Sequence, residues 1–219
     1  MIFEIDNVEL YFAEKQILNG IYLKAETGKI TGILGSNGSG KSSLLKIFFG
    51  SLTPSNKLIR IDKKPFLKPL FTSEKIKYLS QDSFLPKQLT LSRIFQLFEV
   101  GWNDFTTLFD TFSKYKNNKI DELSGGERRV VETFLILKSK AEIVLLDEPF
   151  SHITPVYIDR IKDLMREEKN QKAVVITDHM YRHIIDVTDD LYLLKNGCTH
   201  LLQNPKQLED YKYLNVGSI

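Results

Sequence analysis

Alternating apolar and polar residues open the chain, and wholly apolar runs follow further along. Residues 1–12, MIFEIDNVELYF, alternate over their first half, as a strand with one buried face does. Residues 17–35 read as two further strands on either side of a turn at Glu26–Gly28. The runs EIVLLDEP and KAVVIT lack this alternation, which is typical of strands covered on both faces in a parallel sheet.

Segments with helical spacing lie between these strands. GKSSLLKIFFG (40–50) predicts a helix that ends at Gly50, and PVYIDRIKDLMREEKN (155–170) predicts an amphipathic helix with proline in its first turn. KLIRID and IKYLS predict short strands. Strands that alternate with helices indicate an α/β fold, in which residues at the ends of parallel strands lie at the edge where such folds bind ligands.

The β-branched strand pattern fades between Leu89 and Lys138. A Lys/Asn-rich turn, KYKNNK, separates two groups of apolar residues at helical spacing. We therefore expect an inserted, mostly helical subdomain in this region. The first group is Leu91, Ile94, Phe95, Leu97 and Phe98, and the second is Val130, Val131, Phe134, Leu135 and Leu137.

Composition argues against several classes of protein. The 219 residues carry 30 basic and 28 acidic side chains, and no long basic block indicates a nucleic-acid-binding protein. The first residues lack the basic flank and apolar run of a signal peptide, and no segment has the roughly 18 apolar residues of a membrane span, so we expect a cytosolic protein. The single cysteine, Cys198, excludes an internal disulfide and reads as a small apolar strand residue.

The pattern Gly35-x-x-x-x-Gly40-Lys41-Ser42 is a P-loop, and it lies between the strand ITGIL and a helix. Its glycines let backbone N–H groups wrap phosphates, with the helix dipole behind them. We expect Lys41 to contact the β- and γ-phosphates and Ser42 to bind Mg²⁺. The alternative, a glycine-rich turn without a ligand, is disfavoured by the strand and helix on either side. The expected ATP contacts here are Gly35, Ser36, Asn37, Gly38, Ser39, Gly40, Lys41, Ser42 and Ser43.

Acids and an imidazole follow two of the apolar strands. Asp147 ends the strand IVLLD, and Glu148 follows it. An Asp-Glu pair after an apolar strand is, taken alone, more often a helix N-cap region. Beside a P-loop, Asp147 is expected to orient the magnesium shell and Glu148 to polarise an attacking water. His179 follows VVIT at the same sheet edge and is expected to reach the γ-phosphate. His183 lies four residues on, but no Cys, Asp or Glu completes a metal site at familiar spacing. His152 and His200 are expected to be structural or solvent-exposed.

The segment LSGGE (123–127) is a second turn suited to an anion. A hydroxyl beside two glycines at the start of a helix presents amide N–H groups to a negative charge. Because the P-loop already provides a phosphate cradle, the residues alone leave open why one domain would need both.

The P-loop, LSGGE, IVLLDEP and TDH, in this order and spacing, resemble the nucleotide-binding subunits of ABC (ATP-binding cassette) transporters over almost the whole chain. The resemblance implies ATP and Mg²⁺ as ligands and a P-loop NTPase (RecA-like) α/β fold. That fold has a mostly parallel sheet core, an N-terminal antiparallel β subdomain and an inserted α-helical subdomain. We expect one domain over 1–219, with 1–82 and 140–219 forming the α/β core and β subdomain, and 83–139 forming the helical subdomain that carries LSGGE.

The resemblance also implies roles for single residues. Tyr11 resembles the aromatic residue that stacks on adenine, Gln81 the glutamine that senses the γ-phosphate, and His179 the switch histidine. Without the resemblance, Tyr11 would be an ordinary strand aromatic and Gln81 an ordinary loop amide. The implied catalytic residues are Lys41, Gln81, Glu148 and His179, and the implied metal ligands are Ser42, Gln81 and Asp147.

By similarity, LSGGE acts on a second subunit. Ser124, Gly125 and Gly126 are expected to hold the γ-phosphate of ATP bound to a partner that faces this chain head to tail. That partner is a second copy of this chain or a paralogous ATP-binding subunit. Hydrolysis removes the γ-phosphate that links the two subunits. The dimer then opens, so the free energy of ATP-dependent dimerisation drives a conformational change.

The implied function is ATP hydrolysis, to ADP and phosphate, that drives integral membrane transporter subunits from the cytoplasmic face of the membrane. The groove around Gln81–Gln88, QDSFLPKQ, is expected to receive a cytoplasmic helix of that partner, and alanine at Phe84 and Leu85 is expected to uncouple transport. The alternative is a soluble ABC ATPase that acts as a scaffold or assembly factor without a transport channel. A third hypothesis, a nucleotide switch that does not hydrolyse ATP, is disfavoured because Lys41, Asp147, Glu148 and His179 are all present.

The chain departs from the family pattern in places. It reads Ser151-His152-Ile153-Thr154 where the family usually has Ser-Ala-Leu-Asp, so Thr154 replaces an acid and we expect altered coupling between the two sites. TDH replaces the commoner order of His then Asp, but counting back from DDLYLLKNG keeps His179 in register. We expect no regulatory domain after the core, and specificity for the transported substrate to reside in the membrane partner.

Overall fold

A four-stranded antiparallel sheet is formed by the N-terminal part of the chain, in the order β2-β1-β4-β5. In this computed structural model, which describes residues 1–218, its long strands pair with Phe3 opposite Ala25 and Ile5 opposite Leu23. The strands are β1 (Ile2–Phe12), β2 (Lys15–Glu26), β4 (Asn56–Ile61) and β5 (Lys64–Pro65). The strands expected at the start of the chain are therefore confirmed.

The second sheet has six strands in the order β10-β9-β3-β8-β7-β6. The five strands from β9 to β6 run parallel, and β10 pairs antiparallel with β9. Every residue of β3, β7 and β8 is buried, as the continuous apolar runs predicted. The strands are β3 (Ile30–Leu34), β6 (Ile76–Leu79), β7 (Ile143–Asp147), β8 (Ala173–Thr177), β9 (Asp190–Lys195) and β10 (Cys198–Leu202).

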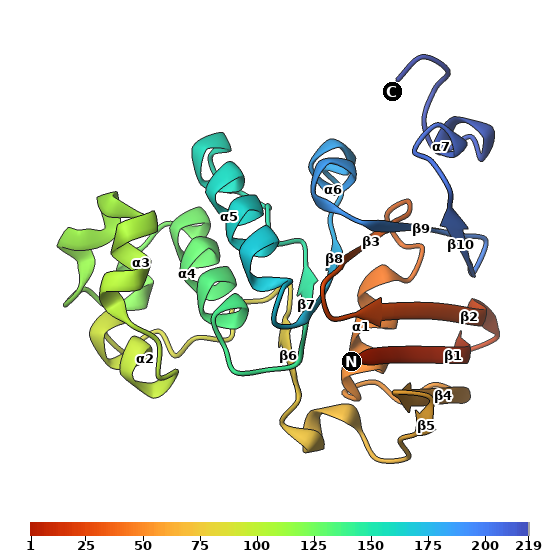
Figure 1. Cartoon of the computed structure of the whole chain (residues 1–219), viewed down its shortest axis with the longest axis horizontal. Coiled ribbons are helices and arrows are strands. Elements are labelled where there is room, and N and C mark those ends of the chain that lie inside the picture. Colours follow the sequence, from red (N-terminus) through yellow and green to blue (C-terminus); the bar gives the residue numbers. More distant parts are fainter. Residues whose placement is uncertain (219) are drawn as a thin grey trace.

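The parallel sheet separates two hydrophobic cores. Along β7, Ile143 and Leu145 face one core, whereas Val144 and Leu146 face the other. The antiparallel sheet and α1 (Lys41–Phe49) cover the first face. The other face is covered by α4 (Gly125–Leu137), α5 (Pro155–Glu168) and α6 (Tyr181–Val187), and Figure 1 shows these helices side by side. This arrangement confirms the α/β class.

The elements between residues 83 and 139, all of which the structure describes, are helical. They are α2 (Leu91–Leu97), α3 (Trp102–Leu108), η2 (Asp110–Tyr115), η3 (Ile120–Glu122) and α4. An aromatic cluster joins α2, α3, η2 and α4, with the ring centroid of Phe105 5.0–5.2 Å from those of Phe95, Phe109, Phe112 and Phe134. Figure 1 shows this region at the opposite end of the molecule from the antiparallel sheet, and we propose to treat it as a helical subdomain.

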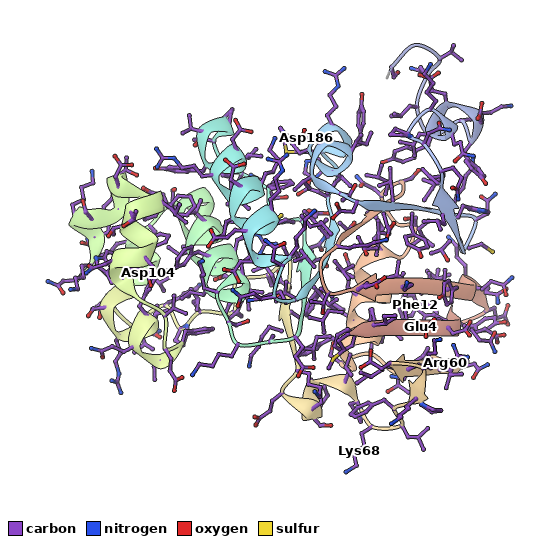
Figure 2. All side chains as sticks on the ribbon, viewed as in Figure 1. Glu4, Phe12, Arg60, Lys68, Asp104 and Asp186 are labelled. Carbon is purple, nitrogen blue, oxygen red and sulfur yellow. The ribbon has the colours of Figure 1, made fainter. Side chains whose placement is uncertain are left out.

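The remaining elements are η1 (Leu70–Ser73) and α7 (Gln207–Asp210). Charged side chains such as Lys68, Asp104 and Asp186 lie on the outside of the molecule (Figure 2). Across the described residues, no helix combines the length and apolar character that a membrane crossing requires.

Candidate functional site

The P-loop connects β3 to α1 and is shaped by glycines. Gly38 and Gly40 have φ values of 76° and 103°, the left-handed region that side chains with a Cβ rarely adopt. A Cβ on Gly40 would also come within 2.8 Å of the Leu18 side chain. The loop therefore follows the path that a phosphate cradle needs only because these positions are glycine.

Lys41 begins α1 and is buried, with its side chain folded back over the loop. Its Nζ donates to the carbonyl oxygens of Gly35 (2.7 Å) and Ser36 (3.2 Å). Burial lowers the pKa of the Lys41 ammonium, because the charged form is poorly solvated there. The ammonium thus lies at the centre of the cradle, where phosphate oxygens are better partners than carbonyl groups.

The expected magnesium ligands Ser42 and Asp147 lie next to each other. The Ser42 hydroxyl donates to Oδ1 of Asp147 at 3.1 Å, although the residues are far apart in sequence. The Tyr78 hydroxyl donates to Oδ2 of the same carboxylate at 2.9 Å, a contact that no sequence motif indicated. Burial raises the pKa of the Asp147 carboxyl, because these two hydrogen bonds replace its lost hydration only in part.

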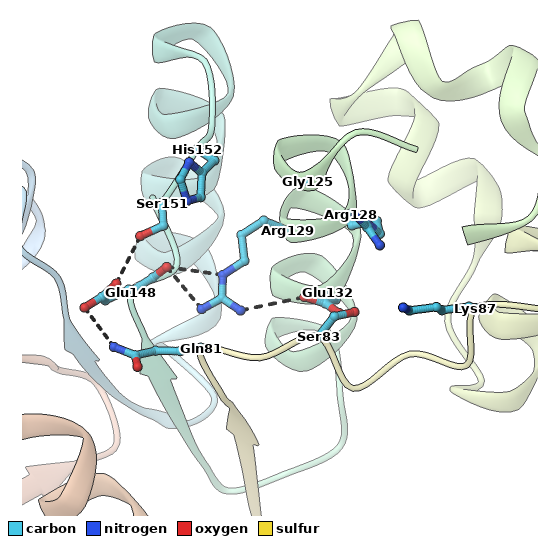
Figure 3. Close-up of a pocket in the computed structure, with 10 residues that line it drawn as sticks. All are labelled: Gln81, Ser83, Lys87, Gly125, Arg128, Arg129, Glu132, Glu148, Ser151 and His152. Carbon is cyan, nitrogen blue, oxygen red and sulfur yellow. Dashed lines mark hydrogen bonds and ion pairs between the residues drawn. The ribbon is translucent and has the colours of Figure 1, made fainter. Parts of the chain in front are cut away.

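The Glu148 side chain is held by its neighbours beside the P-loop. Gln81 Nε2 donates to Oε1 of Glu148 at 2.8 Å, and the Ser151 hydroxyl donates to Oε2 at 3.3 Å (Figure 3). The His179 imidazole lies 4.0 Å from Oε2. Glu148 itself has φ 54°, an uncommon conformation for a non-glycine residue and one that clusters at functional sites.

Two cavities meet at Gln81 and Glu148. The first, of about 570 Å³, is lined by Lys41, Ser42, His179 and further P-loop residues. The second, of about 600 Å³, is lined by the start of α4 and by Lys87 and other basic side chains (Figure 3). Gln81 and Glu148 line both cavities, so the hydrogen bond between them lies in the wall that the cavities share.

The structure brings Phe12, rather than Tyr11, to the P-loop cavity. Phe12, the last residue of β1, lines it together with Ile17. Tyr11, the residue before it, does not line the cavity. The pairing register shifts between Leu10 and Tyr11, where a bulge interrupts the ladder. We therefore revise the expectation for Tyr11, because the aromatic side chain available to an adenine ring in this cavity is that of Phe12.

The LSGGE turn caps helix α4. The Ser124 hydroxyl accepts from the Glu127 amide at 3.2 Å, and the Glu127 carboxylate accepts from the Ser124 amide at 2.8 Å, which together form a capping box. A Cβ on Gly126 would lie 2.2 Å from the His152 carbonyl oxygen, whereas a Cβ on Gly125 would meet no atom within 4 Å. Gly125 lines the second cavity, the one that contains Lys87, and does not line the P-loop cavity. This turn therefore faces away from the chain's own phosphate cradle.

Arg129 is a buried residue that the sequence did not single out. Its guanidinium donates to the carbonyl oxygens of Ser80 (2.6 Å), Asp147 and Glu148 (3.1 Å), and it lies 3.7 Å from the Glu132 carboxylate. Glu132 in turn accepts from the Ser83 hydroxyl at 2.5 Å. Helix α4 is therefore bonded to the backbone that carries Glu148 and to the segment that follows Gln81.

His183, His200 and the cysteine have structural contacts. His183 packs its ring on Phe150 at 5.7 Å, and His200 packs on Tyr211 at 4.9 Å. His152 is exposed. Cys198 begins β10 and donates to the Asn19 carbonyl oxygen at 3.3 Å. Thr154 stands at the N-cap of α5 without a side-chain capping hydrogen bond.

The segment Gln81–Gln88, expected to contact a membrane partner, has one partly exposed and one buried large apolar side chain. Phe84 is 37% exposed, and its ring lies 6.0 Å from that of Phe98 at the end of α2. Leu85 is only 4% exposed and belongs to the core, so of these two side chains only Phe84 is available at the surface. The segment lacks helical or strand periodicity, which is why the sequence could not separate the two.

The donor set fits a magnesium nucleotide. Mg²⁺ prefers oxygen ligands and is often held by one carboxylate and a hydroxyl together with phosphates, which matches the Ser42–Asp147 pair. The glycine-shaped loop and the inward-pointing Lys41 supply the amide groups and the cation that phosphates require. Lys41, Ser42, Gln81, Glu148 and His179 line one cavity, and Asp147 is bonded to Ser42, whereas Gly35, Ser36 and Ser39 are not part of that lining.

Comparisons with known proteins agree with this geometry. The family model described as ABC transporter matches residues 18–151. The lipopolysaccharide export system ATP-binding protein LptB of Haemophilus influenzae is 28% identical over 223 residues, covering 94% of this chain and 92% of that protein. The manganese transport system ATP-binding protein MntB of Listeria innocua is 28% identical over 208 residues, covering 87% and 85%.

Solved structures share the fold. The ATP-binding subunit of an ABC transporter gives a TM-score of 0.79 at 18% identity, covering 98% of this chain and 94% of that one. A bacterial Atm1-family ABC exporter with ATP bound gives a TM-score of 0.81 at 20% identity, covering 96% of this chain and 40% of the exporter.

Proposed function

This chain belongs to the ABC transporter family, and from that premise we propose that it binds and hydrolyses ATP as the energy-supplying subunit of a membrane transporter. The observation that carries the proposal is the convergence of Lys41, Ser42, Glu148 and His179 on one cavity with a P-loop along its wall. Relatives named for lipopolysaccharide export and manganese transport favour transport over a soluble scaffold role.

Each side chain has a defined task in this reaction. Lys41 exchanges its two carbonyl partners for phosphate oxygens, and Phe12 packs against the base. Bound at Ser42 and Asp147, Mg²⁺ would neutralise charge on the phosphates. Glu148 uses its carboxylate to orient an attacking water and accept a proton from it, while Gln81 and Ser151 fix the two carboxylate oxygens.

We further propose that the complete site needs two subunits. The Ser124–Gly126 turn presents amide groups at the start of a 13-residue helix, and Gly125 is open to approach by another molecule. The turn lines a different cavity from its own P-loop, which supports contact with the γ-phosphate of a partner facing head to tail. The partner is a second copy or a paralogous ATP-binding subunit.

The surface around Phe84 is the proposed contact for the membrane partner. Phe84 is partly exposed, and its segment is bonded to α4 through Ser83 and Glu132. Because α4 also contacts the backbone of Glu148 through Arg129, a displacement of this segment can reach the catalytic carboxylate. This location would place the chain at the cytoplasmic face of a membrane.

Purification from native membranes tests the transport role. The tagged chain is expected to bring down an integral membrane subunit, and Phe84→Ala is expected to weaken that association without changing ATP turnover of the isolated chain. Recovery of an active ATPase without any membrane protein, from both membrane and soluble fractions, would favour the scaffold hypothesis instead.

A further inference from the structure

Asp178, which lies between β8 and His179, is a fully buried carboxylate. Its Oδ2 accepts from the Phe150 amide at 3.0 Å, and its Oδ1 accepts from the Met180 amide at 2.9 Å. Phe150 lies in the loop that follows Glu148, and Met180 directly follows His179. One side chain therefore bonds the two loops that present the proposed catalytic groups.

The same carboxylate lies beside the proposed switch histidine. Nδ1 of His179 is 3.3 Å from Oδ1 of Asp178 and 4.0 Å from Oε2 of Glu148. The imidazole is thus placed between two carboxylates, of which one is buried and one faces the P-loop cavity.

A neutral residue would be easier to bury at this position. Burial raises the pKa of the Asp178 carboxyl, and the imidazole of His179 opposes that shift. Burying a charge is unfavourable unless hydrogen bonds and a nearby cation offset the lost hydration. The amide groups of Phe150 and Met180 provide those hydrogen bonds, and both belong to loops beside the catalytic groups.

We infer that Asp178 is a positioning residue for ATP hydrolysis. Its carboxylate fixes the loop after Glu148 and the turn that carries His179 as one unit, so that both side chains reach the γ-phosphate together. This inference rests on the proposed ATPase function. It assigns Asp178 no contact with ATP, Mg²⁺ or water, and it leaves the P-loop contacts unchanged.

The variant Asp178→Asn tests this role through steady-state kinetics. An amide offers one acceptor oxygen where two N–H groups require two, so one loop is released. We expect kcat for ATP to fall by about tenfold or more while KM changes by less than about twofold, because nucleotide binding uses other residues. Asp178→Ser, which is smaller and neutral, is expected to show the same split.

Asp189→Asn is the matched control. Asp189 Oδ2 also accepts from a backbone amide, that of Ile30 at 2.7 Å, but at the other end of strand β3 from the P-loop. This variant is expected to lose stability without losing kcat. An equal loss of kcat in the Asp178 and Asp189 variants would overturn the inference, as would failure of both Asp178 variants to fold.

A double-mutant cycle separates positioning from general stability. In a His179→Ala background, Asp178→Asn is expected to lower kcat by much less than it does in the wild type, because part of its effect passes through His179. Independent, multiplying effects would overturn the inference. A wild-type chain without ATPase activity would instead reject the proposed function, whereas an active wild type with an unchanged Asp178→Asn rate rejects only the role of Asp178.

Discussion

Gly126 packs against the carbonyl group of His152 so closely that a Cβ at position 126 would lie 2.2 Å from the oxygen. This contact joins the first turn of α4 to the loop after Glu148. Gly126→Ala is expected to destabilise the fold by about 1–3 kcal/mol, the usual effect of overpacking. Thermal or denaturant unfolding of the nucleotide-free protein measures this change.

Gly125→Ala is the matched control for that substitution. Its Cβ would meet no atom within 4 Å, so stability should stay within about 1 kcal/mol of the wild type. Because Gly125 is proposed to approach a partner's phosphate, the same variant is expected to weaken ATP-dependent dimerisation. Sedimentation or light scattering measures this effect. Equal stability of the two variants would contradict the packing explanation.

Glu148→Gln should separate ATP binding from hydrolysis. The amide keeps the size of the side chain but cannot accept a proton from water, so kcat is expected to fall by about 100-fold or more. The variant should bind ATP and form a stable dimer, which size-exclusion chromatography with and without ATP can detect. ATP turnover at the wild-type rate would contradict the proposed role of Glu148 as general base.

Phe12→Ala and Tyr11→Ala test which aromatic residue contacts the base. Phe12 lines the P-loop cavity, so its removal should weaken ATP binding by roughly tenfold, the scale of one lost stacking contact. Tyr11→Ala should leave affinity within about twofold, since Tyr11 is not part of that lining. Titration with a fluorescent ATP analogue measures both, and the opposite order would restore the role that similarity assigned to Tyr11.

Asp147→Asn should stabilise the nucleotide-free protein at neutral pH. The pKa of the Asp147 carboxyl is raised in the folded state, so the folded protein binds this proton more tightly than the unfolded chain does. Its contribution to stability is therefore full at low pH and is lost as pH rises through the folded pKa. The neutral amide avoids this loss, and the melting temperature should rise by about 2–4 °C for each kcal/mol regained.

Two further measurements check this prediction. The advantage of Asp147→Asn should disappear at acidic pH, where the wild-type carboxyl is protonated, and the variant should gain less stability than the wild type from magnesium and ATP together. A melting temperature below that of the wild type across the whole pH range would contradict the prediction.

Leu85→Ala and Phe84→Ala should affect different properties. Leu85 is a core residue, so its truncation should lower the free energy of unfolding by about 2–5 kcal/mol. Phe84 is partly exposed, and its truncation should lower it by less than about 1 kcal/mol. Urea unfolding tests both, and a larger loss for Phe84 would show that its packing on Phe98 dominates.

Much of the fold followed from local patterns. The apolar runs at β7 and β8 and the P-loop helix are encoded within short segments, so their type could be predicted without tertiary information. The start of helix α4 was likewise indicated by a hydroxyl beside two glycines at Ser124–Gly126. Short strand β5 and helix α3 escaped prediction because their residues carry no clear period.

The positions of some side chains depend on tertiary contacts and could not be predicted from the sequence. Similarity assigned the adenine contact to Tyr11, whereas Phe12 lines the cavity, next to a register shift between β1 and β2. Arg129 reads as a surface charge beside Glu127, and its burial becomes evident only when distant carbonyl groups converge on it. Asp178 lies within the TDH segment, but its bond to the Phe150 amide joins a loop that is distant in sequence, which the segment alone does not indicate.

The acceptors of the Arg129 guanidinium have a consequence for how this protein can evolve. They are main-chain carbonyl oxygens at positions 80, 147 and 148, and every amino acid carries one. Mutation of those three positions therefore cannot delete the acceptors, whereas lysine at position 129 would lack the planar fork that reaches all of them. The hydrogen bonds between α4 and these loops therefore depend on the side chain at position 129 and not on those at positions 80, 147 and 148.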